Sequence, residues 1–265
     1  MALIEHFKEL KNRLIKSLIA LALGTVGGWF LYPPVIDALS SPLEQIAREM
    51  HRNASMNFAS IASPFEFKLR IALQIGLIIS SPVWIYQVWA FITPGLTRKE
   101  RKYTLAFMAA AIPLFLAGVY VAWSVIPNIV RALLQFTPSE GVSNLITADE
   151  YLTFATHTML FLGISFLVPV VLVGVNMLGI LSGKTIMKAW RVTVFAVFVL
   201  AAIAAPGADA LSMFMLAVPL LALFFLAIGI CLMNDRRRAR RESQANEETD
   251  SSADTATPFE DLGKL

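Results

Sequence analysis

Two polar side chains in the apolar stretch 151–183 have the types found in hydrolase sites, a histidine at position 157 and a serine at position 165. Eight helical residues separate them, which is about 12 Å along a helix axis and too far for a base to activate a nucleophile. The G-x-S-x-G turn of serine hydrolases is absent from the sequence. We therefore predict two tolerated polar groups, and an intramembrane protease stays an alternative that would require Ser165 for turnover.

Other catalytic or cofactor motifs are equally weak. The segment 179–185 imitates a phosphate-binding loop around Gly183 and Lys184, but Leu178 stands where the motif needs its first glycine, and no strand precedes it. The three histidines are dispersed and Cys231 is the only cysteine, so no metal site is visible. We expect no metal, cofactor or nucleic-acid partner and no enzymatic activity.

Two carboxylates beside the apolar stretches remain as candidates. Glu9 precedes Arg13 by four residues, and Glu100 follows Thr97 by three. On spacing alone structural roles are favoured, because the first pair is a favourable i,i+4 helix pair and the second completes a helix-capping box.

The elements that must position these residues are membrane-spanning helices. The chain of 265 residues is 57% hydrophobic and 15% charged, with a mean hydropathy of +0.65, which is more apolar surface than a soluble domain of this size buries. Because a spanning helix needs about 20 apolar residues, the gaps between charged residues predict an all-α protein with six transmembrane helices. The gaps are 17–36, 71–97, 103–130, 151–183, 192–208 and 210–234.

The distribution of lysine and arginine predicts the orientation. Basic residues accumulate beside alternate ends of the spans, and such flanks lie on the cytoplasmic side. We therefore expect a multi-pass membrane protein with both termini in the cytoplasm. The basic flanks lie at 8–13, 98–102, 184–191 and 236–241.

Two further regions complete the predicted organisation. The stretch 37–70 between the first two spans is too long for a turn, so we expect an ordered extracytoplasmic cap, with a short helix beginning at Ser41-Pro42. Residues 1–234 form the predicted membrane domain. Residues 235–265 form a cytoplasmic tail, first basic and then acidic, whose polar composition from Glu242 onward predicts disorder.

One alternative function follows from the polytopic pattern itself. A secondary transporter or channel for a small solute would also span the membrane several times, but such transporters usually keep ionisable residues near the midplane. The six apolar stretches contain no Asp, Glu, Lys or Arg. This absence weakens the transporter hypothesis, although a channel with an uncharged pore is still an alternative.

Four sequence motifs change this balance. The most specific runs Tyr86-Gln87-Val-Trp89-Ala-Phe91 and continues through Pro94 to the pair Glu100-Arg101. The others are His6-Phe-Lys-Glu9-Leu-Lys-Asn-Arg13-Leu, Ser41-Pro42-Leu and Ser63-Pro64-Phe. Together they resemble the TatC subunit of the twin-arginine (Sec-independent) protein translocase, and the resemblance continues through Pro169 and the turn 206–209 to about Asn234.

The resemblance implies six helices in the bacterial cytoplasmic (inner) membrane with both ends cytoplasmic, and the orientation agrees with the charge pattern. It also implies a receptor that binds the twin-arginine signal peptides of folded cargo proteins, and export driven by the proton-motive force. The implied partners are single-span TatA/TatB-type subunits, the lipid bilayer and further copies of the chain in the complex.

The resemblance also implies roles for individual residues. Glu9 and Glu100 match the positions that bind the two signal arginines, for which carboxylates are suitable partners. Phe91 and Arg13 match their neighbours, and Pro42 matches a proline of the cap. Met213 and Asp209 lie where single-span partners are expected to make contact.

The sequence departs from the family pattern at three positions. Leu167 stands where many members have a glutamate, so no role of that carboxylate transfers. Lys11 replaces a common arginine, and Met213 replaces a glutamine of some members.

Overall fold

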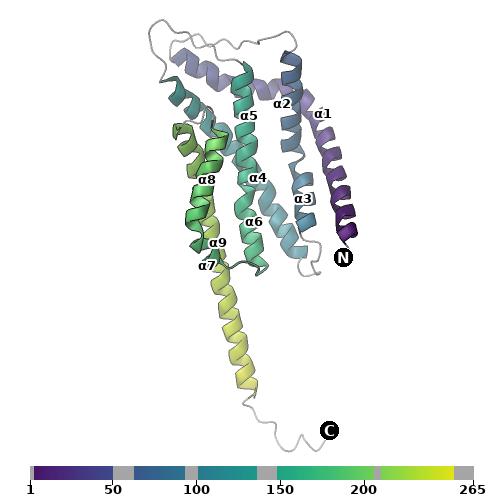
Figure 1. Cartoon of the computed structure of the whole chain (residues 1–265), viewed down its shortest axis with the longest axis vertical. Coiled ribbons are helices and arrows are strands. Elements are labelled where there is room, and N and C mark those ends of the chain that lie inside the picture. Colours follow the sequence, from purple (N-terminus) through teal and green to yellow (C-terminus); the bar gives the residue numbers. More distant parts are fainter. Residues whose placement is uncertain (1–2, 50–62, 93–100, 136–147, 206–209, 254–265) are drawn as a thin grey trace, which may run out of the picture.

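The computed structural model describes residues 3–49, 63–92, 101–135, 148–205 and 210–253. Within these ranges the chain is helical and contains no strand. Figure 1 shows the helices as an elongated bundle, with the start of the first helix and the projecting end of the last at the same end. The helices are α1 (Leu3–Glu49), α2 (Ser63–Ile79), α3 (Ser81–Ile92), α4 (Arg101–Leu134), α5 (Ala148–Ser165), α6 (Leu167–Met177), α7 (Gly183–Lys188), α8 (Trp190–Ala204) and α9 (Ala210–Ala253).

Several of these helices are long and apolar enough to cross a membrane. Four segments qualify by length and composition, namely Glu5–Ile46, Phe107–Leu134, Glu150–Met177 and Ala210–Asn246. The pair α2 and α3 qualifies as a fifth when its two helices are taken as one bent span, and α8 is a shorter apolar helix. These six units coincide in sequence with the six predicted spans, and α8 is the short fifth segment.

The first helix differs from the prediction at its second half. α1 continues through Pro33, Pro34 and Pro42 to Glu49, so Ser41 does not begin a separate helix. The Ser41 hydroxyl instead donates to the Ala38 carbonyl at 3.4 Å, within the same helix. In Figure 1 this half turns away from the N-terminal half and crosses the far end of the bundle. The expected cap is thus formed in part by α1 itself, and residues 50–62 lie outside the described ranges.

The contact between α1 and α2 depends on small residues. A Cβ atom added at Gly24 would lie 2.6 Å from the Gly76 carbonyl oxygen, and one added at Gly28 would overlap the Ala72 carbonyl oxygen. Helices in membranes approach this closely only where glycines or other small residues face each other. This crossing fixes how α2, and α3 after it, lie along α1.

The bend between α2 and α3 directs α3 toward the start of α1. The two helices meet at 59° around Ser80, next to Pro82, which supplies no backbone N–H. The Trp84 indole N–H donates to the Leu77 carbonyl at 2.9 Å across this break. Proline breaks in membrane helices persist where neighbouring groups satisfy the freed carbonyls in this way.

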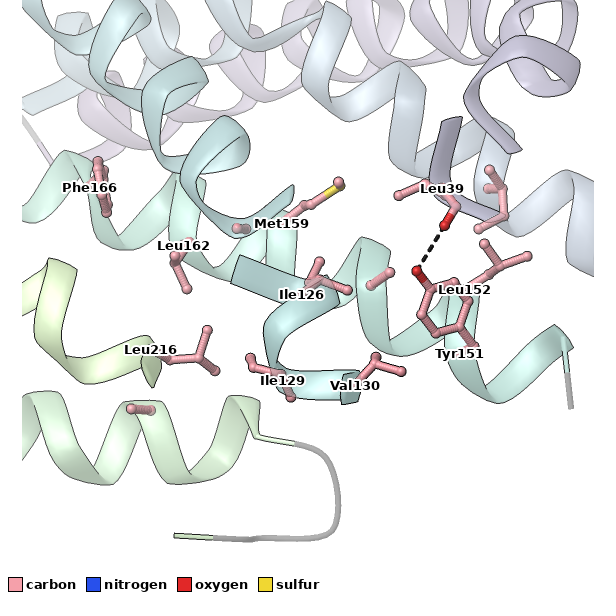
Figure 2. Packing of buried hydrophobic residues seen from close by; sticks show 14 of the residues in the cluster. Leu39, Ile126, Ile129, Val130, Tyr151, Leu152, Met159, Leu162, Phe166 and Leu216 are labelled. Carbon is pink, nitrogen blue, oxygen red and sulfur yellow. Dashed lines mark hydrogen bonds between the residues drawn. The ribbon is translucent and has the colours of Figure 1, made fainter. Parts of the chain in front are cut away.

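The main core joins α1, α2, α4, α5, α8 and α9 (Figure 2). Its polar anchor is the Tyr151 hydroxyl, which donates to the Leu39 carbonyl at 2.8 Å in a buried position. Because Leu39 lies in the half of α1 that crosses the bundle, this bond attaches that half to the start of α5.

The last helix extends beyond the bundle. α9 continues to Ala253, past Glu242, where the sequence predicted disorder, and Arg238 pairs with Glu242 at 3.1 Å along it. At the base of this extension Asp235 accepts hydrogen bonds from Asn176 Nδ2 at 2.8 Å and from the Gly183 backbone N–H at 2.6 Å. These bonds hold α6 and α7 against α9, so the segment that imitates a phosphate-binding loop has a structural role.

Candidate functional site

Polar and aromatic side chains meet where the start of α1 lies beside the end of α3. On α1, His6, Glu9 and Arg13 follow one another at intervals of three and four residues and therefore share a helix face. On α3, Gln87 and Phe91 share a face in the same way. We call these five residues the rim site, because they lie at the end of the bundle where the chain begins (Figure 1).

The charged half of the rim site is a carboxylate that already holds a guanidinium. Arg13 donates to Glu9 Oε1 twice, from Nη2 at 2.6 Å and from Nε at 3.0 Å. The side chains are 28% exposed for Glu9 and 24% for Arg13, so the pair is half-buried rather than fully solvated. Among the contacts of the described residues none ends on Glu9 Oε2, and this oxygen can accept a second guanidinium.

A contact between helices orients the arginine. Arg13 Nη1 lies 3.4 Å from Gln87 Oε1, a long hydrogen bond that joins α1 to α3. An arginine held by both Glu9 and Gln87 loses the freedom to swing into water. The Glu9–Arg13 pair is consequently held beside α3.

The aromatic half of the site lies on the N-terminal side of Glu9. The rings of His6 and Phe91 stack, with centroids 4.6 Å apart and planes inclined by 21°. Both side chains are partly buried. Because His6 lies three residues before Glu9 on the same helix face, this stack lies beside the carboxylate.

The structure brings together three of the predicted site residues, Glu9, Arg13 and Phe91. Glu100 and Asp209 lie outside the described residues. Pro42 lies inside α1 and is partly buried. Met213, in the first turn of α9, packs partly buried against the main core, while the next residue, Phe214, is 52% exposed.

Sequence reasoning gave no role to His6 and Gln87. Helical spacing placed His6 on the face of Glu9, and Gln87 on the face of Phe91. That signal predicts two faces, but it does not predict that the faces meet, because the meeting depends on the bend at Ser80 and on the glycine contact between α1 and α2.

The residues weighed as a protease pair do not form one. His157 and Ser165 both lie in α5, eight residues apart. His157 lines a cavity of about 590 Å³ together with Arg70, Glu150 and Ile203. Ser165 is not among the residues that line this cavity.

The architecture and the rim site together indicate a class of protein. Several apolar helices of spanning length, together with one bent pair, make this a multi-pass, all-α membrane protein. Its half-buried carboxylate at one end of the bundle is suited to bind a cationic group.

Comparisons with known proteins identify the family. Residues 5–219 match the family model of TatC, the Sec-independent protein translocase protein. The TatC protein of Rothia mucilaginosa (strain DY-18) is 46% identical over 267 residues, which cover all of this chain and 91% of the relative. TatCy of Bacillus subtilis (strain 168) is 32% identical over 252 residues, covering 95% of this chain and 96% of the relative.

A solved structure agrees with the sequence relatives. A crystal structure of TatC, described as a twin arginine translocase receptor, superposes with a TM-score of 0.75 at 28% identity and covers 87% of this chain and 99% of its own. The chain belongs to the TatC family of Sec-independent protein translocase proteins.

Proposed function

We propose that this chain is the receptor subunit of a twin-arginine protein translocase, and that the rim site binds the arginines of the signal peptide. The observation that carries the proposal is the half-buried Glu9 carboxylate, which already holds one guanidinium through Oε1. Membership of the family and the likeness to a twin arginine translocase receptor give the class of ligand.

The proposed binding reaction adds a second ion pair to Glu9. A signal arginine approaches Glu9 on Oε2, while Arg13 stays on Oε1 and is drawn toward Gln87. The His6–Phe91 stack covers one side of the new pair and reduces its competition with water. The second signal arginine pairs with Glu100, the other acidic residue matched by the family pattern. The step makes and breaks only hydrogen bonds and ion pairs, so the subunit acts as a receptor and not as an enzyme.

The remaining parts of the proposal concern the assembly. Both termini and the rim site face the cytoplasm, because the basic flanks do so in bacterial inner membranes. Single-span TatA/TatB-type subunits bind near Asp209 and Met213, where Phe214 offers an exposed apolar side chain. The complex contains further copies of the chain and uses the proton-motive force to export folded cargo.

The test is site-specific photocrosslinking of a twin-arginine signal peptide to the protein in membranes. We expect crosslinks at the rim site that fall about tenfold or more in Glu9→Ala and Glu100→Ala, since hydrogen bonds to a charged group contribute about 1.5–3 kcal/mol. A signal carrying two lysines should also crosslink less, because lysine lacks the planar fork of arginine.

Glu5→Ala is the matched control for Glu9→Ala. Glu5 is an exposed carboxylate one turn earlier on the same helix, so its loss changes the charge of α1 without touching the site. Equal crosslinking by the wild type and both site variants would contradict the proposed roles of the carboxylates. Absence of crosslinks to the wild type would contradict the receptor function.

A further inference from the structure

A second cavity lies deeper in the bundle, toward the end opposite the rim site. Its volume is about 330 Å³, and its wall is formed by α1, α2, α4 and α5. Leu39 and Met159, two of its residues, are visible in Figure 2. Most of the wall is apolar, as at Val35 and Ile78, and Gln74 and Thr156 are polar members of it.

Gln74 is the unusual member of this wall. Its side chain is 5% exposed, and among the described residues no donor reaches its Oε1 atom. The other polar member, Thr156, is already engaged, since its hydroxyl donates to the Leu152 carbonyl at 2.7 Å. A buried acceptor without a partner is unfavourable in an apolar environment and usually marks a group that a ligand or water completes.

We propose that this cavity binds the apolar stretch of the signal peptide and that Gln74 Oε1 accepts a hydrogen bond from a hydroxyl group in that stretch. The inference rests on the proposed function and adds to it a second, membrane-embedded contact. A serine or threonine within an otherwise apolar segment has the required chemistry. Its hydroxyl can donate to Gln74 Oε1, while the neighbouring apolar side chains pack against the cavity wall, which includes Val35.

The position of the cavity favours the signal peptide over other occupants. α1 carries residues of both the rim site and the cavity wall. α2 lines the cavity and leads directly into α3, which carries the rest of the rim site. Gln74 and Gln87 are thirteen residues apart, which is about 20 Å measured along α2 and α3. Because the two helices meet at 59°, the direct separation is shorter than this path. An apolar helical stretch of about 13 residues that starts at the rim is therefore long enough to reach Gln74. A lipid chain can fill the apolar wall but has no donor for Oε1.

The experiment uses the full-length protein in membranes, with a photoreactive amino acid at Ile78 in the cavity wall or at Leu10 beside Glu9. The probes are twin-arginine signal peptides whose apolar stretch is all leucine, or contains one serine moved residue by residue along it. We expect one register of serine to raise the Ile78 crosslink about fivefold over the all-leucine signal, as one hydrogen bond allows. Gln74→Leu should remove this preference and leave the Leu10 crosslink in place.

Thr158→Val is the matched control. Thr158 is 1% exposed and its hydroxyl also has no partner among the described residues, but it does not line this cavity. Its replacement removes the same kind of buried polar group and should preserve the serine preference.

Each other outcome overturns part of the account. Crosslinks at Leu10 without crosslinks at Ile78 would refute the cavity and leave the proposed receptor function intact. If the Ile78 crosslink does not depend on the position of the serine, or if that dependence persists in Gln74→Leu, Gln74 Oε1 does not bind the signal. Loss of the Leu10 crosslink for every signal would refute the receptor function itself.

Discussion

At the scale of single residues, the rim site combines a short contact with a long one. The two bonds from Arg13 to Glu9 Oε1 are short, whereas the bond from Arg13 to Gln87 is long at 3.4 Å. An i,i+4 ion pair contributes only a few tenths of a kcal/mol to a helix. A ligand can therefore share the Glu9 carboxylate with Arg13 at small cost, and the contact with Gln87 keeps the Arg13 guanidinium beside α3.

This arrangement predicts the effect of removing the cross-helix acceptor. Gln87→Leu keeps the size of the side chain but leaves Arg13 without its partner on α3. We expect signal-peptide affinity to fall about two- to tenfold, the range given by one hydrogen bond of about 0.5–1.5 kcal/mol. The measurement is the dissociation constant of a labelled twin-arginine signal for the purified protein. Val88→Leu, at an exposed neighbouring position, should leave the constant unchanged, and an unchanged constant in Gln87→Leu would remove the residue from the site.

At the scale of helices, the glycine face of α1 sets the geometry of the rim site. Gly24, Gly28 and Gly76 let α1 and α2 touch through their backbones. α3 then follows from α2 through the bend at Ser80, with Trp84 bonded across the break. The position of α3 relative to the start of α1 is therefore the product of one close contact and one bend.

Two neighbouring glycines offer a direct test of this contact. A Cβ atom at Gly28 would overlap the Ala72 carbonyl oxygen, whereas one at Gly27 meets nothing within 4 Å. We expect Gly28→Ala to lower the free energy of unfolding by about 1–3 kcal/mol through overpacking. Gly27→Ala should be neutral, or stabilising by up to about 1 kcal/mol, because alanine favours a helix.

Unfolding of the two variants in detergent, followed by circular dichroism, measures the difference. Equal stability of Gly27→Ala and Gly28→Ala would mean that α1 and α2 do not touch at this point. A loss in Gly28→Ala should also weaken signal binding, since the crossing positions α3.

At the scale of the whole molecule, the two described ends of the chain lie at the same end of the bundle (Figure 1). The rim site lies there as well, together with α7 and the Asp235 network that holds α6 and α7 against α9. The half of α1 that crosses the opposite end is attached to α5 by the bond between Tyr151 and Leu39. The bundle thus has one end that carries the rim site and an opposite end that a helix crosses.

The predicted orientation can be measured with single cysteines in a Cys231→Ala background. Cys231 is buried, so its replacement by alanine removes a thiol from the interior and leaves the surface unchanged. We expect cysteines at Lys8 and Ser243 to react with a membrane-impermeant reagent from the cytoplasmic side only. A cysteine at the exposed Phe65 should react from the opposite side only. Reaction of the Lys8 and Ser243 positions from different sides would refute an even number of crossings.

The class of the protein and its apolar segments could be predicted from the order of the residues alone. In lipid, the N–H and C=O groups of an apolar segment find hydrogen-bond partners within a helix, and charged side chains are costly to insert. The gaps between charged residues therefore mark the spanning helices directly. The family motif likewise pointed to Glu9, Arg13 and Phe91 as candidates. The structure differs from expectation at Ser41, where the helix is unbroken, and after Glu242, where the tail begins as a helix. Local composition and capping patterns do not show whether a helix simply continues.

The meeting of helix faces, in contrast, is visible only in the folded bundle. The angle at which α1 crosses α2, together with the bend at Ser80, brings Gln87 to Arg13. The same packing places Gln74 in an apolar cavity, where no donor among the described residues reaches its Oε1 atom. These angles follow from the packing of side chains between helices, which the spacing of residues within one helix does not contain.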